Sequence, residues 1–191
     1  MKANQRRISM RKARNVLGLA LLLGAFLYLL PVLDAADNPV PDSPEVAELL
    51  TQAKSHALQL RDDAQLMHQF SLMKVSWESH AEQIMTIKGH ANNLGKVLKQ
   101  MADRQESASP WQQSAIERIT PLAQEMATNI ETTIEHLNNN QSRLHMPQYK
   151  EYLSANSEVA SSLSELISDY VAYGKNKAKY DRLGSKIEIT R

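Results

Sequence analysis

The fold is decided most clearly by residues 77–101, which read WESHAEQIMTIKGHANNLGKVLKQM. Mostly apolar residues recur here every seven positions in two columns, Trp77, Ile84, Ala91 and Leu98 beside His80, Ile87, Leu94 and Met101. In an α-helix, two columns offset by three residues lie on one face. Because such a stripe must be covered by other helices, the stretch predicts an amphipathic helix over about residues 77–105.

Three further segments show the same spacing, at residues 44–73, 110–140 and 147–181. Their columns are Val46, Ala53, Leu60 and Met67 beside Leu50, Ala57 and Ala64; Ile116, Ala123, Ile130 and Leu137 beside Ile119, Met126 and Thr133; and, more loosely, Tyr149, Asn156, Leu163 and Tyr170. Four helices of similar length with short links predict an all-α fold. We expect an antiparallel, coiled-coil-like four-helix bundle with up-down-up-down connections.

Capping residues mark where these helices begin. Ser43 is a favourable N-cap, and the proline after it suits the first helical position. Ser109 has a proline after it and Gln112 three positions later, the arrangement of a capping box. Pro147 separates the third segment from the fourth.

Two places leave alternatives open. Residues 73–76 contain neither glycine nor proline, so the first two segments form either separate helices or one long rod. Pro121 lies inside the third segment, where it removes a hydrogen bond and should bend the axis. Alternatively, Thr120 caps a helix that restarts there.

Residues 1–36 have the composition of an export signal. Six basic residues and no acidic residue precede an uncharged, apolar run at residues 16–33, which is followed by the small Ala35 and Ala36. The segment is expected to be a cleaved signal peptide or, alternatively, an uncleaved anchor with its basic arm inside. The predicted organisation is a signal or anchor, a proline-rich spacer, a bundle domain and a C-terminal tail, at residues 1–36, 37–43, 44–182 and 183–191.

Charge and cysteine content exclude several classes of function. The chain has 22 Lys+Arg and 21 Asp+Glu; without residues 1–36, which hold six and one, 16 and 20 remain, a net charge of −4. A mildly acidic domain offers no general surface for nucleic acid, which requires a basic face. Because cysteine is absent, disulfides, thiolate metal sites and covalent haem attachment are excluded as well.

The six histidines do not form a recognisable metal or haem motif. None has a glutamate three positions before it, as di-iron bundles require, and no two are four residues apart. His80 with Met67 or Met73 could hold haem, and His68, His80 and Met73 crowd the first turn, where a soft metal could bind. We favour a structural role for these residues, with methionines filling the core.

The remaining chemical candidates also have ordinary structural explanations. Carboxylate pairs such as Glu131/Glu135 have the spacing of solvated helix faces, and Gly89 and Gly95 are interpreted as packing residues. The tyrosine pairs 149/152 and 170/173 are interpreted as core residues rather than a ligand cleft. We therefore predict no catalytic, cofactor-binding or metal-binding residues.

The C-terminal residues 174–191 carry six basic and two acidic side chains. We interpret them as a solvated helix end, although contact with anionic lipid or an acidic cell-wall polymer is the alternative. The segment thus adds no catalytic group.

Together these features predict an exported, non-enzymatic bundle that acts through protein–protein contacts in the cell envelope, as an adaptor, chaperone-like protein or scaffold. The alternative function is a haem, metal or small-molecule carrier that uses the bundle interior. The expected partner is an envelope protein, and the apolar seam closes within one chain or between two copies. The expected location is periplasmic or secreted, or anchored in the inner membrane facing the periplasm.

Overall fold

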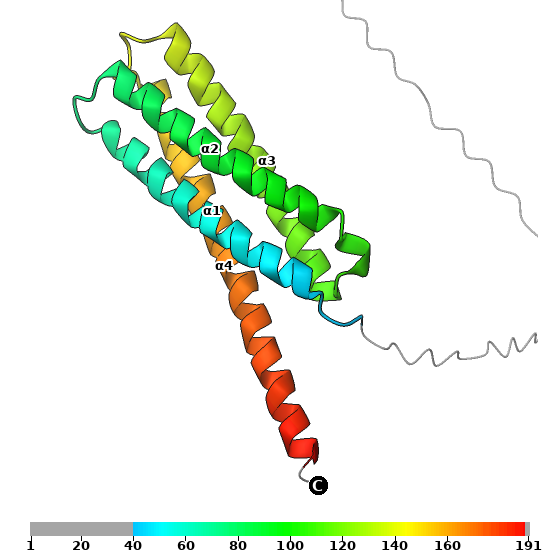
Figure 1. The fold of residues 1–191 in the computed structure, drawn as a ribbon. Coiled ribbons are helices and arrows are strands. Elements are labelled where there is room, and N and C mark those ends of the chain that lie inside the picture. Colours follow the sequence, from blue (N-terminus) through cyan, green and yellow to red (C-terminus); the bar gives the residue numbers. More distant parts are fainter. Residues whose placement is uncertain (1–39, 190–191) are drawn as a thin grey trace, which may run out of the picture. The chain divides into compact units, whose positions relative to one another are not determined.

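The structure, a computed structural model, describes residues 40–189; the expected signal or anchor at residues 1–36 lies outside the described residues. Its elements are α1 (Pro44–Phe70), α2 (Trp77–Ala102), the short 3₁₀ helix η1 (Gln105–Ser107), α3 (Pro110–Asn139) and α4 (Pro147–Ile189), shown in Figure 1. Residues 40–189 contain four α-helices and no strand, so the prediction of an all-α helical bundle is confirmed.

The helices pack in a ring around one apolar core. α1 contacts α2 and α4, and α3 also contacts α2 and α4, so each helix lies against two neighbours (Figure 1). The columns read from the sequence supply most of the fully buried side chains, including Leu60, Met67, Ile84, Ile87, Met101, Ile119, Ile130 and Leu137. The alanines at positions 53, 57 and 64 of α1 are also buried, which lets α2 and α4 approach α1 closely.

The first two segments are separate helices rather than one rod. α1 ends at Phe70, and the side chain of Ser76 accepts a hydrogen bond from the backbone N–H of Ser79 (3.3 Å) at the start of α2. Ser76 is therefore the N-cap of α2, and it separates the two helices although the loop contains neither glycine nor proline.

α3 runs without interruption through Pro121. The hydroxyl of Thr120 donates to the carbonyl of Ile116 one turn earlier (2.7 Å), so it does not cap a new helix. The alternative of a restart at Thr120 is wrong.

The beginnings of α1 and α3 are held together by one buried amide. Gln112, which is completely buried, accepts from the backbone N–H of Ser43 (2.8 Å) and donates to the Ser43 carbonyl (2.8 Å). Its oxygen also accepts from the backbone N–H of Ser109 (3.1 Å), as the predicted capping box requires. The cap of α3 therefore fixes the first residue of the bundle as well.

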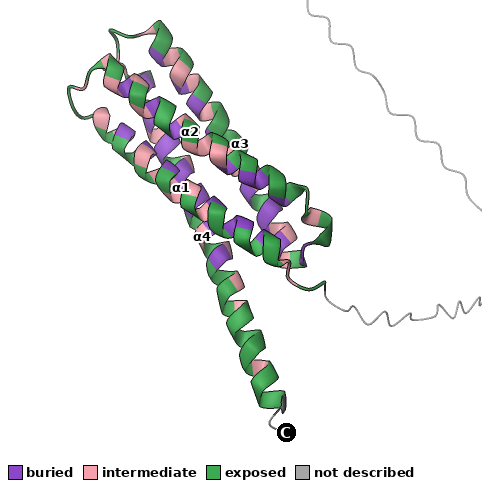
Figure 2. Cartoon of the chain, in the orientation of Figure 1, coloured by how far each residue is buried: buried purple, intermediate pink, exposed green. Residues whose placement is uncertain are grey.

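α4 is longer than expected. It continues to Ile189, and its last turns project past the other helices and are almost entirely exposed (Figures 1 and 2). Among residues 40–189, no helix combines the length and the hydropathy needed to cross a bilayer.

Candidate functional site

The candidate site is an open groove between α2 and α3, here called the α2–α3 groove. Its volume is about 360 Å³, and small residues line much of it: Ala91, Gly95, Ala102, Ala123 and Ala127. Leu98 and Ile130 add larger apolar surface beneath them. The groove is thus a shallow, mainly apolar hollow on the outside of the bundle.

The groove forms because small residues on α2 and α3 face one another. These two helices make the least extensive contact of the four neighbouring pairs. Ala91 and Ala123 belong to the apolar columns, yet both are only partly buried, whereas Ala57 of α1 is fully buried. The same residue type therefore closes one side of the bundle and leaves the other side open.

The rim of the groove is polar and charged. Lys88 of α2 and Glu131 of α3 form an ion pair across it (2.7 Å), and Lys99 and Gln124 also line it. An apolar floor inside a polar rim is the usual composition of a surface that receives apolar side chains from another protein.

The glycines of α2 do not serve helix packing. A Cβ added at Gly89 or at Gly95 would meet no atom within 4 Å, so the interpretation of both as packing residues is wrong. Gly95 leaves the groove open, because a larger side chain there would occupy it. At Gly174, in contrast, a Cβ would lie only 2.8 Å from Cη2 of Trp111.

A second hollow, the loop-end cleft, lies where the α1–α2 and α3–α4 loops meet. It measures about 520 Å³ and is lined by Phe70, Met73, Trp77, His80 and His145, among others. The structure thus brings His80, Met73 and His145 to one cleft, but His68 does not line it.

His80 has a structural partner. It is 2 % exposed, Phe70 packs edge-on against its ring, and its Nδ1 lies 2.9 Å from the hydroxyl of Tyr149. Burial lowers the pKa of His80 and raises that of Tyr149, because the charged form of each loses its hydration. Both groups are therefore neutral near pH 7 and suited to a hydrogen bond in the core.

The other predicted candidates are dispersed. His90 pairs with Asp63 (3.2 Å), and His136 stacks on Tyr149. Within residues 40–189, no group of three or more His, Asp or Glu side chains is placed to hold a metal ion. Met67 is buried, whereas Met73 is largely exposed, so the two methionines considered for haem lie in different environments.

One polar layer interrupts the core. The amide nitrogen of Asn156 donates to the hydroxyl of Thr133 (2.7 Å), which donates to the carbonyl of Asn129 (2.7 Å). The amide oxygen of Asn156 is buried without a partner. The layer joins α3 to α4 but leaves one acceptor unsatisfied, which offsets part of the stability that the hydrogen bonds contribute.

The tyrosines divide between core and surface. Tyr149 is fully buried, as predicted, whereas Tyr170 contacts Ser114 and Arg118 near the surface. Tyr173 is 52 % exposed and packs edge-on against Trp111, so its assignment to the core is wrong.

No protein family, curated protein or solved structure matches this chain. The assignment of a site therefore rests on geometry. The α2–α3 groove was missed at the level of sequence, although small residues at facing column positions, Ala91 and Ala123, were the available signal.

Proposed function

We propose that this protein is an exported, non-enzymatic bundle that acts through protein–protein contacts in the cell envelope, with the α2–α3 groove as its contact surface. The observation that carries the proposal is the groove itself: apolar at its floor, polar at its rim and open to solvent. A helix of a partner protein fits it best, because a row of apolar side chains along such a helix can enter a groove that runs between two others.

The charge pattern agrees with a selective contact. Lys88 and Glu131 satisfy each other across one part of the rim, while Lys99 lies further along the same groove. A partner helix with apolar residues on one face and an acidic residue beside Lys99 would complement the surface. The signal or anchor expected at residues 1–36 supports an envelope location.

The test places a photo-cross-linking amino acid at Asn92, which lines the groove, in the full chain expressed in its own host. We expect a covalent adduct of discrete mass in the envelope fraction. Gly95→Leu should fill the groove and abolish that adduct. Intact-mass analysis of the same fraction reports whether residues 1–36 have been removed.

A matched control uses the other exposed glycine of the same helix. Gly89→Leu adds the same side chain outside the groove, and neither glycine has an atom within 4 Å of its Cβ position. The adduct should survive this change. The proposal fails if Gly95→Leu, still folded by circular dichroism, leaves the adduct unchanged, or if a cytoplasmic fraction contains the protein with residues 1–36 intact.

A further inference from the structure

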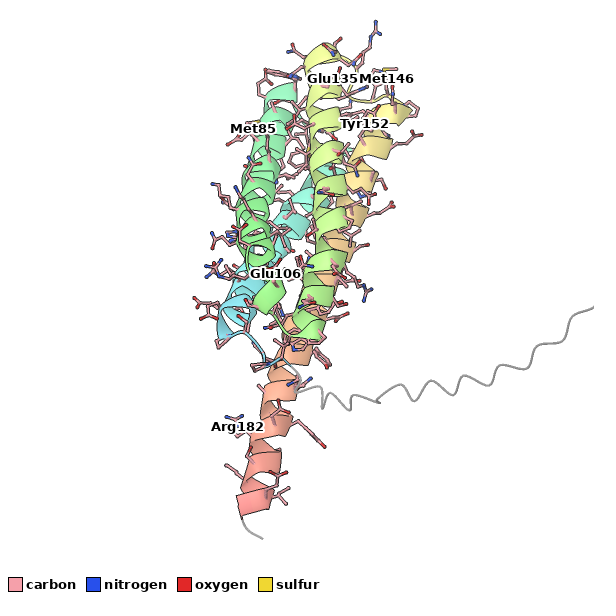
Figure 3. All side chains as sticks on the ribbon, turned by 90° about the vertical axis from the view of Figure 1, so that its right-hand side faces the viewer. Met85, Glu106, Glu135, Met146, Tyr152 and Arg182 are labelled. Carbon is pink, nitrogen blue, oxygen red and sulfur yellow. The ribbon has the colours of Figure 1, made fainter. Side chains whose placement is uncertain are left out.

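The projecting part of α4, residues 175–189, is called the α4 extension. It is about 20 Å long at 1.5 Å per residue. Tyr180, Leu183 and Ile187 expose 78, 49 and 66 % of their surface there. In Figure 3, Arg182 stands on this part of α4, with no other helix beside it. A soluble helix end would ordinarily carry polar residues at such positions.

The exposed apolar residues are not a continuation of the bundle core. Leu163, Ile167 and Val171 are the last buried residues of α4. At 100° per residue, Tyr180, Leu183 and Ile187 lie about 190° around the helix from them. The face that continues the core stripe carries small or polar residues such as Ala178 and Ser185. The α4 extension therefore has an apolar face of its own.

A basic stripe borders this apolar face. Lys175, Lys179, Arg182 and Lys186 are spaced by four, three and four residues, which places them together about 100° from the apolar centre. Within residues 40–189, Lys175, Lys179 and Arg182 form no ion pair, whereas Lys177 on another side contacts Asp42 and Asp181. The helix is thus both amphipathic and basic.

Charge is separated along the molecule. Residues 40–173 hold 10 Lys+Arg and 17 Asp+Glu, whereas residues 174–191 hold six and two. The acidic bundle would be repelled by an anionic surface that the α4 extension would attract. Such a surface would orient the protein with the end of α4 toward it.

We propose that the α4 extension lies on an anionic lipid bilayer, with Tyr180, Leu183 and Ile187 in the headgroup region and the basic stripe on lipid phosphates. Interfacial helices combine an apolar face with lysine and arginine beside it. This interaction is independent of the partner proposed for the α2–α3 groove.

The position of Asp42, near the start of the described chain, favours a lipid bilayer as the surface that the α4 extension contacts. Asp42 contacts Lys177 (3.2 Å) at the base of the α4 extension, so the described part of the chain begins at this end of the bundle. The apolar run ends at residue 33, and nine residues span at most about 30 Å. Residues 16–33, if retained as an anchor, would hold a bilayer within reach of the same end of the bundle.

A second copy of the chain is a poorer occupant. In an antiparallel dimer formed along this face, the basic stripes of the two helices would face each other across the seam. Three apolar residues also make a much shorter seam than a stable coiled coil uses. Like charges beside a short seam disfavour pairing, whereas an anionic membrane neutralises them.

Because the chain has no cysteine, one engineered thiol can carry an environment-sensitive fluorophore. The full chain with Leu183→Cys is labelled and added to phosphatidylcholine vesicles, with or without about one third phosphatidylglycerol. We expect a blue shift only with phosphatidylglycerol, and Lys179→Gln with Arg182→Gln should weaken vesicle binding roughly 30-fold. Added salt should weaken it too.

Ser185→Cys is the matched control, because Ser185 lies on the opposite side of the same turns and should stay in water. Both labelled chains contain residues 1–39, so the difference between the two labels reports the α4 extension alone. A shift without vesicles that grows with protein concentration would assign the face to a second copy and overturn the proposal. No shift at Leu183, or equal shifts on both kinds of vesicle, would also overturn it.

Discussion

Gly174→Ala should be destabilising relative to the same substitution elsewhere in the bundle. An added Cβ at Gly174 would lie 2.8 Å from Cη2 and 3.2 Å from Cζ2 of Trp111, closer than carbon atoms normally approach. The indole cannot easily move away, because its Nε1 donates to Asp42 (2.7 Å) and Tyr173 packs against the ring. Adding a methyl group to a well-packed site in this way lowers the free energy of unfolding by about 1–3 kcal/mol.

The helix itself gains from each glycine replacement. Alanine is favoured over glycine by about 1 kcal/mol inside a helix, so Gly95→Ala, which meets no atom within 4 Å, should be stabilising by that amount. At Gly174 the clash opposes the gain, and the net effect is a loss of up to about 2 kcal/mol. The two variants should therefore differ by about 1–3 kcal/mol in the free energy of unfolding.

Urea unfolding of residues 38–191, followed by far-UV circular dichroism, measures this difference. In a Trp111→Phe background the clashing atoms are missing, so Gly174→Ala should recover most of the gain seen at Gly95. Equal stabilisation by Gly174→Ala and Gly95→Ala in the wild-type background would refute the steric argument.

Three further predictions concern buried polar groups. Gln112→Ala should lower the free energy of unfolding by about 2–4 kcal/mol, because the backbone N–H groups of Ser43 and Ser109 both lose their acceptor. Gln112→Leu, tested by the same urea titration, should not restore the lost stability. Burial lowers the pKa of His80 in the folded protein, so His80 is protonated in the unfolded chain first as the pH falls below about 6.5. The free energy of unfolding should therefore decrease below this pH, and His80 alone contributes at most about 1.4 kcal/mol per pH unit. His80→Gln should reduce that slope in thermal melts between pH 7 and 5; an unchanged slope would assign it to other groups. Thr133→Val should lower the free energy of unfolding by about 1–3 kcal/mol, because it leaves the amide of Asn156 unpaired. Adding Asn156→Leu should restore most of the loss. A double variant no more stable than the single one would show that the polar layer is required.

The bundle could be predicted because its signals are local and periodic. Leu60, Ile87 and Ile119 stand in columns that any helix of this spacing would bury, and all three are fully buried. The capping residues Ser43 and Gln112 were readable for the same reason, since a cap depends on neighbours within one turn.

What could not be predicted depends on contacts between distant parts of the chain. The partner of His80 is Tyr149, 69 residues away, and nothing near either residue indicates the pair. Ala91 and Ala57 occupy equivalent column positions, yet only Ala57 is fully buried, because exposure depends on how closely the neighbouring helix approaches. The groove follows from that approach and not from either sequence segment alone.

The length of α4 was underestimated for a related reason. The core stripe ends at Val171, and a new apolar face begins at Tyr180 on the other side of the helix. When the apolar residues move to another side of the helix, the sequence pattern looks like the end of that helix. The backbone of α4 nevertheless remains helical to Ile189. The end of the core stripe therefore does not mark the end of α4.

The junction at residues 42–43 also determines how the bundle responds to mechanical load. Asp42 is bonded to Trp111 and Lys177, and Ser43 to Gln112, so a pull on the preceding chain is shared by α1, α3 and α4 at once. Peeling α1 away alone would first require breaking these bonds in parallel.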